Sequence, residues 1–472
     1  MKIRQPAALV TLFFTEMWER FSYYGMRALL VLYLVNSAGY ARADALALYA
    51  TYTGLVYLSP ILGGYIADRY LGYRKSILTG GLIMMLGHFA MAVPSLLHYA
   101  LGLLVIGNGF FKPNIATFLG TFYGENDSRR DGGFTIFYMG INLGAFISPL
   151  VAGSLGERLG WDWGFASAGV GMAFGLIQFW LGRNRLAHEG YPPGRQSFVW
   201  RDGLDILLIS GFSIALLWAI FCVWPMMAPL IQAAPIFLRV LLPLGILVAL
   251  LTNVHRQDGK EAMERVLAII ILCTFVIAFW MGFEQAGGTM SLFADTETDR
   301  HLLGWEIPAS YFQAINPLVI LLLGPVFSAS WQRLDNSRFR LPTPAKMAVG
   351  MIILGLGFVL LYIAQQLAEK QGTVGPLWLV GVYFLHTVGE LCLSPIGLSM
   401  ITKLAPLRVA GLLMGIWYFA SGIANYLAGM LESLLVTSGV PLYGFLVASS
   451  IGTGVLLLAL TPIIGKWMHG KG

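Results

Sequence analysis

The sequence contains few charged residues. Asp, Glu, Lys and Arg make up only 11% of its 472 residues, whereas a soluble globular chain is nearer a quarter charged. Hydrophobic residues make up 57%, and the mean hydropathy is +0.71. A soluble core cannot hide so many apolar side chains, so lipid must solvate much of the surface. We therefore predict an all-α protein that crosses a membrane many times.

Cysteine is also scarce. The three cysteines, Cys222, Cys273 and Cys392, lie far apart in apolar segments, which argues against a disulfide framework or a metal site. The net charge of +6 comes from basic residues spread over many loops, so we expect no nucleic-acid partner. No small-residue cleavage site follows the first apolar run, so we expect that run to be retained.

Apolar stretches of about 20 residues recur along the whole chain. We predict fourteen membrane helices, at 7–35, 45–67, 76–94, 98–121, 133–156, 164–182, 203–223, 235–253, 264–290, 309–331, 345–367, 376–401, 410–434 and 443–465. Residues 1–182 and 263–472 would each form a six-helix bundle, and 183–262 would be a linker with two extra helices. No loop is long enough for a separate soluble domain.

Lys and Arg are distributed unevenly between the predicted loops. With a cytoplasmic N-terminus, 22 of the 30 basic residues lie in cytoplasmic segments and only four in external loops. The other four lie within predicted helices: Arg20, Arg27, Lys112 and Arg239. Because cytoplasmic loops carry the excess of basic residues, we predict that both termini are cytoplasmic.

A pattern of glycine, acidic and basic residues lies between the second and third predicted helices. It reads GGYIADRYLGYRK at 63–75. This order resembles the signature that the major facilitator superfamily carries at the same place. A loop that is merely basic would not require these glycine and acidic residues in this order. The resemblance implies the major facilitator fold, with 6+6 helices and an inserted helical pair.

Several charged residues lie within the predicted helices. A charge at the bilayer centre costs about 2.5–3.5 kcal/mol on insertion scales, so these side chains must pair or face water. Buried ion pairs stabilise a fold less well than apolar packing, so function is the better reason for most of them. They are Glu16, Glu19, Arg20, Arg27, Lys112, Glu284 and Glu390.

Their arrangement predicts a cavity with opposite charges on its walls. Glu16, Arg20, Tyr23 and Arg27 recur at helical spacing and form one polar face on the first helix. The basic side chains belong to the first half of the chain, whereas two of the carboxylates belong to the second half. A peptide carries a carboxylate at one end and an ammonium group at the other, so this polarity matches a short peptide.

Seven segments resemble the proton-dependent oligopeptide transporter family of the major facilitator superfamily. The most specific is EMWERFSYYGMR at 16–27, which is similar to the family's ExxER signature. The others follow in the family's order: GNGFFKPN at 107–114, FYMGINLGAFISP at 137–149, FWMGFEQAGG at 279–288, FQAINP at 312–317, GELCLSPIGLSM at 389–400 and MGIWYFASGIAN at 414–425. The resemblance implies a symporter that imports di- and tripeptides with protons by alternating access.

The resemblance also implies roles for the matched residues. Arg20, Tyr24, Arg27 and Lys112 would bind the peptide carboxylate, and Asn142, Asn316 and Glu390 the amino terminus. Tyr57, Trp280 and Trp417 would shape side-chain pockets, although both tryptophans could instead be packing residues. The two asparagines could equally bridge helices.

Two departures from the mammalian members bear on coupling and origin. Ala50 stands where those relatives carry a helix-two histidine, and the connection near 366–375 is too short for their large extracellular domain. We therefore expect a bacterial-type monomer in the inner membrane, driven by the proton gradient without a cofactor. The coupling residues would be Glu16, Glu19 and Glu284, with Glu284 pairing with Arg27 when the outer gate is closed.

Other classes of protein fit less well. The chain lacks GxSxG, HExxH and Walker A motifs, so we expect neither an enzyme nor an ATP-driven pump. A channel needs a continuous pore, and opposite charges on two halves fit a gated cavity better. The nearest alternative is a major facilitator carrier of nitrate, a drug, a sugar or an amino acid, although Glu390 should repel an anion that lacks an ammonium group.

Overall fold

Long apolar helices make up most of the structure. The computed structural model describes residues 5–124, 127, 129–186, 189–191, 200–201, 204–209, 211–212, 215, 219, 236–302, 304–338, 340–436 and 438–470. The predicted seventh helix, at 203–223, lies partly outside the described residues, and Cys222 lies outside them.

Six long helices form the first part of the chain, as predicted. They are α1 (Ala7–Asn36), α2 (Arg42–Ile66), α3 (Gly72–Met91), α4 (Leu97–Gly120), α5 (Arg130–Arg158) and α6 (Trp161–Leu181). Short helical turns connect or extend some of them: η1 (Ala67–Leu71), η2 (Pro94–Leu96) and η3 (Gly182–Leu186). Within this group α1 packs against α5 and α6, and α3 packs against α4.

The second part of the chain has less regular boundaries. Its helices are α8 (Ile236–Phe283), α9 (Thr289–Thr296), α10 (Ile315–Asp335), α11 (Thr343–Gln371), α12 (Leu377–Leu404), α13 (Ala410–Val436) and α14 (Leu442–Trp467). The turns are η4 (Glu284–Gly287), η5 (Ala309–Ala314) and η6 (Leu407–Val409). The strands β1 (His301–Leu302) and β2 (Trp305–Glu306) form a short antiparallel hairpin.

Three predicted boundaries in this part were wrong. The loop expected after residue 253 is helical, because α8 continues to a break at Gly259, whose φ of 87° an L side chain rarely adopts. The helix expected over 264–290 ends at Phe283, and Gly288 starts α9 with non-helical dihedrals. The first residues of the helix expected over 309–331 form the 3₁₀ turn η5. Gly259 and Gly288 provide the non-helical backbone dihedrals at the first two boundaries. Apolar periodicity alone does not reveal these breaks.

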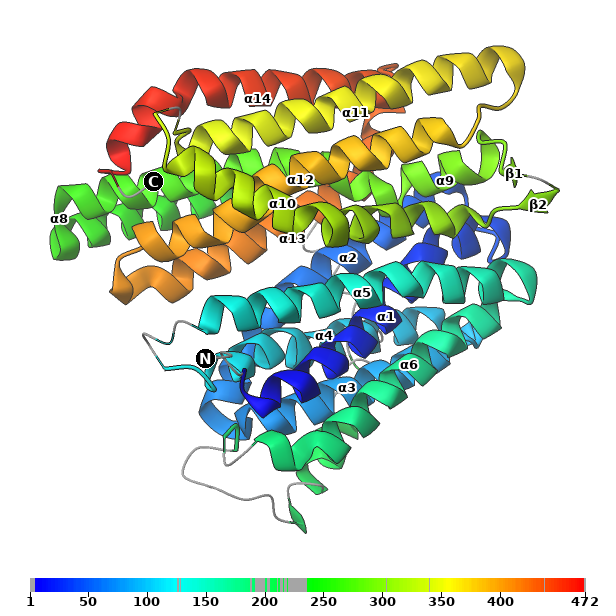
Figure 1. Ribbon diagram of the computed structural model, residues 1–472, viewed down its shortest axis with the longest axis horizontal. Coiled ribbons are helices and arrows are strands. Elements are labelled where there is room, and N and C mark those ends of the chain that lie inside the picture. The colour runs from blue at the N-terminus through cyan, green and yellow to red at the C-terminus, as the bar shows by residue number, and fades with distance from the viewer. Residues whose placement is uncertain are drawn as a thin grey trace.

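The two groups of helices lie side by side and meet along two seams. Figure 1 shows α1–α6 below α10–α14, with both termini at one end of the molecule and the β-hairpin at the opposite end. One seam joins α2 to α13 and the other joins α5 to α10 and η5. We call the end with the hairpin the hairpin end and the other the terminal end.

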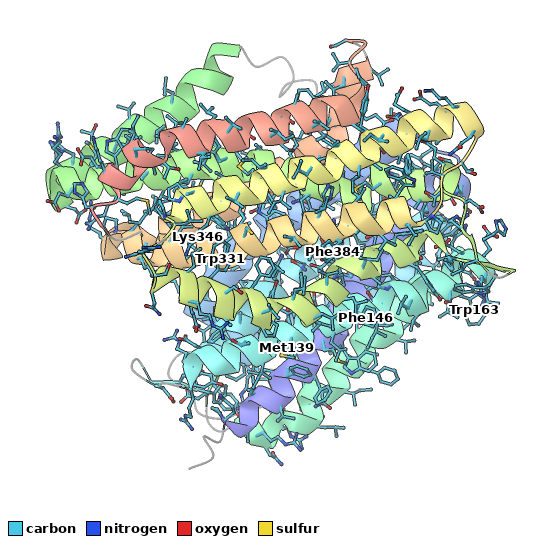
Figure 2. The ribbon with its side chains drawn as sticks, turned by 45° about the horizontal axis from the view of Figure 1, so that its top comes forward. Met139, Phe146, Trp163, Trp331, Lys346 and Phe384 are labelled. Carbon is cyan, nitrogen blue, oxygen red and sulfur yellow. The ribbon has the colours of Figure 1, made fainter. Side chains whose placement is uncertain are left out.

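Apolar side chains cover the outside of the molecule. Met139, Trp163 and Phe384 are among many large hydrophobic residues with exposed side chains (Figure 2). Nine stretches of the described chain are long and apolar enough to cross a membrane. An apolar exterior of this extent needs lipid as its solvent, which agrees with the predicted membrane protein.

The signature at 63–75 forms the tight connection between α2 and α3. Gly72 has a φ of 71°, which lets α3 begin directly after η1. Arg74 donates to the carbonyl oxygens of Leu186 and Glu189, at 2.9 and 2.7 Å, and Lys75 pairs with Asp205 at 2.9 Å. The two basic residues therefore hold the start of the linker against the first group of helices.

Candidate functional site

A cavity of about 170 Å³ lies between the two groups of helices. Residues of α1, α2 and α5 form one wall, and residues of α8, η4, η5, α10 and α12 form the other. The residues that line it are Tyr24, Arg27, Tyr57, Tyr138, Ile141, Asn142, Ala145, Pro149, Trp280, Phe283, Glu284, Ala286, Gln313, Asn316, Pro317, Ile320, Tyr383, His386, Thr387 and Glu390. The cavity is smaller than a typical drug-sized pocket of about 300–1,000 Å³, so it suits a small solute.

An ion pair joins the two walls. Arg27 of α1 pairs with Glu284 of η4, and both side chains are largely buried. The Arg27 Nε–H also donates to the hydroxyl oxygen of Tyr49, at 2.7 Å. Glu284 reaches Arg27 because α8 ends one residue earlier and the 3₁₀ turn carries its side chain into the cavity. The structure thus shows the pair that was expected for a closed outer gate.

A second carboxylate, Glu390 of α12, lies on the same wall as Glu284, beside polar side chains. The Asn316 amide donates to Glu390 Oε2 at 2.8 Å and to Thr387 Oγ1 at 3.0 Å. Only 9% of Glu390 is exposed, and no salt bridge to this carboxylate is present among the described residues. A buried carboxylate that only neutral groups contact attracts a cation, such as an ammonium group.

The remaining predicted charges form a separate cluster in the first group of helices. Arg20 Nε lies 2.8 Å from Glu16 Oε1 and 2.6 Å from Glu19 Oε2. Asn108 of α4 donates to Glu19 Oε1 at 3.5 Å. The ammonium group of Lys112 lies 4.2 Å from the centre of the Tyr57 ring, and Tyr57 itself lines the cavity. Lys112 itself is not among the residues that line the cavity.

The structure places the predicted site residues in three different surroundings. Tyr24, Arg27, Tyr57, Asn142, Trp280, Glu284, Asn316 and Glu390 line the cavity. Glu16, Glu19, Arg20 and Lys112 lie in the separate cluster, and Trp417 is 5% exposed and packs in the core. The predicted positive wall of three basic residues is thus reduced to Arg27, because two carboxylates of its own helix hold Arg20.

Sequence reasoning missed several polar residues that line the cavity or contact its lining. Tyr49 holds Arg27, and Thr387 contacts Asn316. Thr387 lies three residues before Glu390, so helical spacing could have placed it on the same face. Tyr138, Gln313 and Tyr383 also line the cavity, and no sequence signal distinguishes them from ordinary polar residues of a membrane helix.

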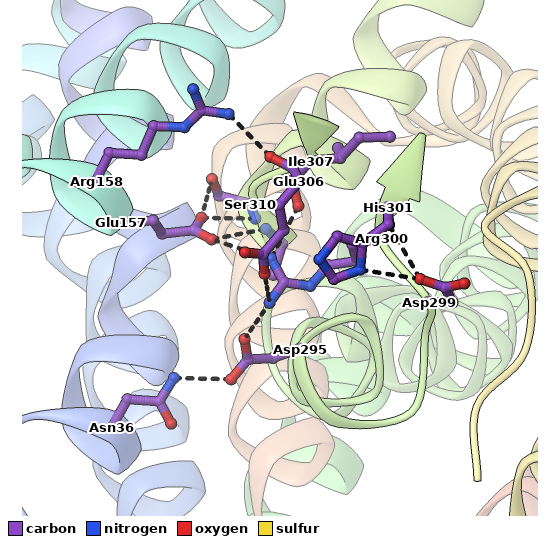
Figure 3. A network of polar contacts seen from close by, with 11 residues as sticks. Asn36, Glu157, Arg158, Asp295, Asp299, Arg300, His301, Glu306, Ile307 and Ser310 are labelled. Carbon is purple, nitrogen blue, oxygen red and sulfur yellow. Dashed lines mark hydrogen bonds and ion pairs between the residues drawn. The ribbon is translucent and has the colours of Figure 1, made fainter. Parts of the chain in front are cut away.

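A network of polar contacts closes the hairpin end. Figure 3 shows Glu157 at the end of α5, where it accepts hydrogen bonds from Ala309 N at 2.7 Å and from Ser310 N at 3.0 Å. The Ser310 hydroxyl donates to the same carboxylate at 2.5 Å. Arg158 donates to the Glu306 carbonyl oxygen at 2.8 Å. These contacts join the first group of helices to the second.

Two further polar contacts join the groups at the same end. Asn36 donates to Asp295 at 2.7 Å (Figure 3), and Arg42 of α2 pairs with Glu432 of α13 at 2.6 Å. Between them and the cavity, the α2–α13 seam is closely packed. The groups are therefore held together at the hairpin end.

Known proteins resemble the chain over almost its whole length. The family model described as "PTR2: POT family" matches residues 74–445. A peptide transporter of Yersinia enterocolitica is 36% identical, with 97% of this chain and 94% of that protein covered. A di-/tripeptide transporter of Lactococcus lactis is 35% identical, with 98% and 97% covered.

Solved structures agree with this relationship. A peptide transporter POT in complex with sulfate superimposes with a TM-score of 0.83 at 36% identity, over 100% of this chain and 97% of that one. A POT family transporter in complex with a thioalcohol-conjugated peptide gives 0.82 at 32% identity, over 98% of both chains. The predicted major facilitator fold is thereby confirmed.

Proposed function

Because the chain belongs to the POT family of transporters, we propose that it is a proton-coupled symporter that imports di- and tripeptides by alternating access. The observation that carries this proposal is the charge arrangement of the cavity. Arg27 lies on one wall, and Glu390 with its amide partner Asn316 lies on the other. A small solute with a carboxylate and an ammonium group satisfies both walls and bridges the two groups of helices, as alternating access requires.

The substrate contacts follow from the positions of the walls. Arg27 and Tyr24 would bind the peptide carboxylate, and Glu390, Asn316 and Asn142 would bind the amino terminus. Tyr57 and Trp280 would contact the peptide side chains, since both line the cavity. Arg20, Lys112 and Trp417 do not line the cavity, so we propose that they support the site when the cavity changes shape.

Coupling would use the pair that joins the walls. A proton on Glu284 neutralises the carboxylate and releases Arg27, which weakens the closed state of the hairpin end and frees the guanidinium for a peptide carboxylate. Glu16 and Glu19 compete for Arg20 in the separate cluster, so a proton on either would leave Arg20 with the other. A membrane potential of 100 mV supplies about 2.3 kcal/mol for each proton that enters.

We also propose how the molecule is oriented in its membrane. We propose an inner-membrane monomer with both termini in the cytoplasm, because the basic residues gather in the loops at the terminal end. The hairpin end is then the outer end. The bundles would be 1–182 and 263–472, with 183–262 as the linker.

Uptake into proteoliposomes tests the proposal. With an inward proton gradient, the purified chain should accumulate labelled dialanine, and an uncoupler should abolish the accumulation. Unlabelled dipeptides should compete, whereas nitrate, glucose and single amino acids should not. Accumulation of one of those solutes in place of dialanine would assign the chain to another branch of major facilitator carriers.

A further inference from the structure

The side chain of Asn316 lies at the centre of a short chain of hydrogen bonds between α10 and α12. Its amide nitrogen donates to Thr387 Oγ1 at 3.0 Å and to Glu390 Oε2 at 2.8 Å. The Thr387 hydroxyl in turn donates to the carbonyl oxygen of Tyr383 at 2.7 Å. Thr387 is 0% exposed, whereas Asn316 is half-buried and lines the cavity. The substrate contacts proposed above give Thr387 no task.

These contacts permit only one orientation of the Asn316 amide. A hydroxyl has one proton to donate, and the Thr387 hydroxyl donates it to the Tyr383 carbonyl oxygen, so it can only accept from Asn316. An ionised carboxylate also only accepts, so Glu390 requires an N–H donor as well. Both hydrogens of the amide nitrogen are therefore used. Turning the amide over would place its oxygen against two acceptors and leave both without a donor.

The amide oxygen of Asn316 is the polar atom that these contacts do not use. No hydrogen bond to this oxygen is present among the described residues, and it is not one of their buried atoms that lack a partner. Since Asn316 lines the cavity, its oxygen is open to the cavity beside the Glu390 carboxylate. An ammonium group donates hydrogen bonds and accepts none, so it suits a carboxylate with an amide oxygen beside it.

We propose that Thr387 is a positioning residue for the amino terminus of the peptide, an inference that rests on the proposed function and deepens it. By accepting from Asn316, Thr387 holds the amide so that its oxygen, and not its N–H₂ group, faces the substrate. An ammonium group then meets two acceptors. An acetylated amino terminus carries a carbonyl oxygen and a single N–H, so it would place an acceptor against acceptors. Thr387 itself is too deeply buried to contact the peptide.

Glu390 alone would not fix the amide in this way. A single hydrogen bond lets the amide group turn about the N–H···O axis, which would move the Asn316 oxygen away from the substrate. A second acceptor in another direction prevents this rotation. Thr387 and Glu390 lie three residues apart on α12, so one helical face presents both acceptors at a fixed spacing.

Replacing Thr387 by valine removes the hydroxyl and keeps the branched shape. In proteoliposomes, the concentrations of dialanine and of N-acetylated dialanine that halve the counterflow of labelled dialanine give a preference ratio. Thr387→Val should lower this ratio by about fivefold, the effect of one hydrogen bond, and Thr387→Ser should keep it within about twofold of wild type. Thr461→Val is the matched control, because the Thr461 hydroxyl donates to the Leu457 carbonyl oxygen at 2.9 Å on α14, away from the cavity. It should leave the ratio unchanged.

A double-mutant cycle tests whether Thr387 acts through Asn316. Asn316→Ala removes the amide, so it should lower the preference ratio by itself. Adding Thr387→Val to Asn316→Ala should then change the ratio by less than about twofold, since the valine has no amide left to release. A residue that only supports the packing of α12 would produce no such dependence.

Three results in the variants would overturn the proposal. An unchanged ratio in Thr387→Val, even with weaker binding of both peptides, would show that Thr387 only packs against its neighbours. A ratio in Thr387→Ser as low as in Thr387→Val would show that the hydroxyl is not the cause. A loss in the double variant equal to the product of the single losses would show that Thr387 acts without Asn316.

Failure of the proposed function would look different, because it would be seen in the wild-type chain before any variant is measured. A wild-type chain without counterflow of dialanine would refute the peptide symport. A wild-type chain that does not prefer dialanine to its acetylated form would refute the ammonium site at Glu390. Either result would remove the basis for the role of Thr387.

Discussion

At the scale of one residue, Glu390 and Glu284 show that two carboxylates of one cavity can have different surroundings. The hydrogen-bond partner of Glu390, Asn316, is uncharged, as is Thr387, to which Asn316 also donates, so the negative charge of Glu390 remains available to a substrate. Glu284, by contrast, is already neutralised by Arg27. Two carboxylates of one cavity can therefore have different tasks, and a substitution that removes only the charge distinguishes them.

We expect Glu390→Gln to weaken uptake of peptides with a free amino terminus by about tenfold or more, because a hydrogen bond to a charged group contributes about 1.5–3 kcal/mol. Peptides with an acetylated amino terminus should lose little. Competition of both kinds against labelled dialanine measures the difference. Glu369→Gln is the control, since Glu369 is an exposed carboxylate near the hairpin end of α11. An equal loss for both kinds of peptide would make Glu390 a structural or gating residue.

At the scale of the helix, small residues allow α2 and α13 to approach closely. A Cβ atom on Gly429 would lie 2.5 Å from Ala50 Cβ and from the Leu46 carbonyl oxygen. A Cβ atom on Gly54 would lie 3.3 Å from the Gly422 carbonyl oxygen. This small-residue seam is typical of membrane helices, where close backbone packing replaces the hydrophobic effect. In this structure the seam joins the two groups of helices.

Gly429→Ala should therefore favour an open hairpin end. Backbone atoms surround the new methyl group, and overpacking of this kind costs about 1–3 kcal/mol. Spin labels at Trp163 and Leu377, which are exposed on opposite groups at this end, should report longer distances. Gly415→Ala is a control on the same helix, because no atom lies within 4 Å of its added Cβ. Unchanged distances in Gly429→Ala would mean that the seam adjusts without separating the groups.

At the scale of the whole molecule, the hairpin end is closed by a few charged residues. Glu157 is the most connected of them across the interface, since all of its hydrogen bonds run to donors in the second group of helices. Arg300 lies 3.8 Å from the same carboxylate and also pairs with Asp295 and Glu306. Opening this end would separate Glu157 from Ala309 and Ser310.

We expect Glu157→Gln to shift the molecule towards the open hairpin end. Glutamine presents an amide N–H₂ group to one of the backbone N–H donors, so at least one charge-assisted hydrogen bond is lost, at about 1.5–3 kcal/mol. Labels at Trp163 and Leu377 should show a larger population at long distance. Asp299→Asn is the control, because Asp299 is an acidic residue at the same end whose side chain contacts His301 on its own loop. Identical distance distributions in the two variants would show that Glu157 does not hold this end closed.

Much of the site could be predicted from helical spacing. The polar face of α1, and the need of Arg27 and Glu284 for a partner or water, follow from the spacing and sign of a few charges in apolar helices. That these two residues pair was proposed for the closed gate, and the structure shows the pair. The break that carries Glu284 out of α8 was not predicted. Apolar periodicity is the same before and after Gly288, and only the backbone dihedrals reveal the turn.

The scarcity of charge, the spacing of apolar runs and the ExxER segment by themselves determined that this chain is a helical membrane transporter of the major facilitator fold. They also determined that basic and acidic side chains meet in the cavity between its two groups of helices. Only the tertiary structure decided that Arg27 faces the cavity whereas Glu16 and Glu19 hold Arg20, and that Lys112 contacts the ring of Tyr57. The physical reason is that one helix determines only which residues share its face. The rotation and depth of each helix depend on packing against neighbours that are distant in the sequence.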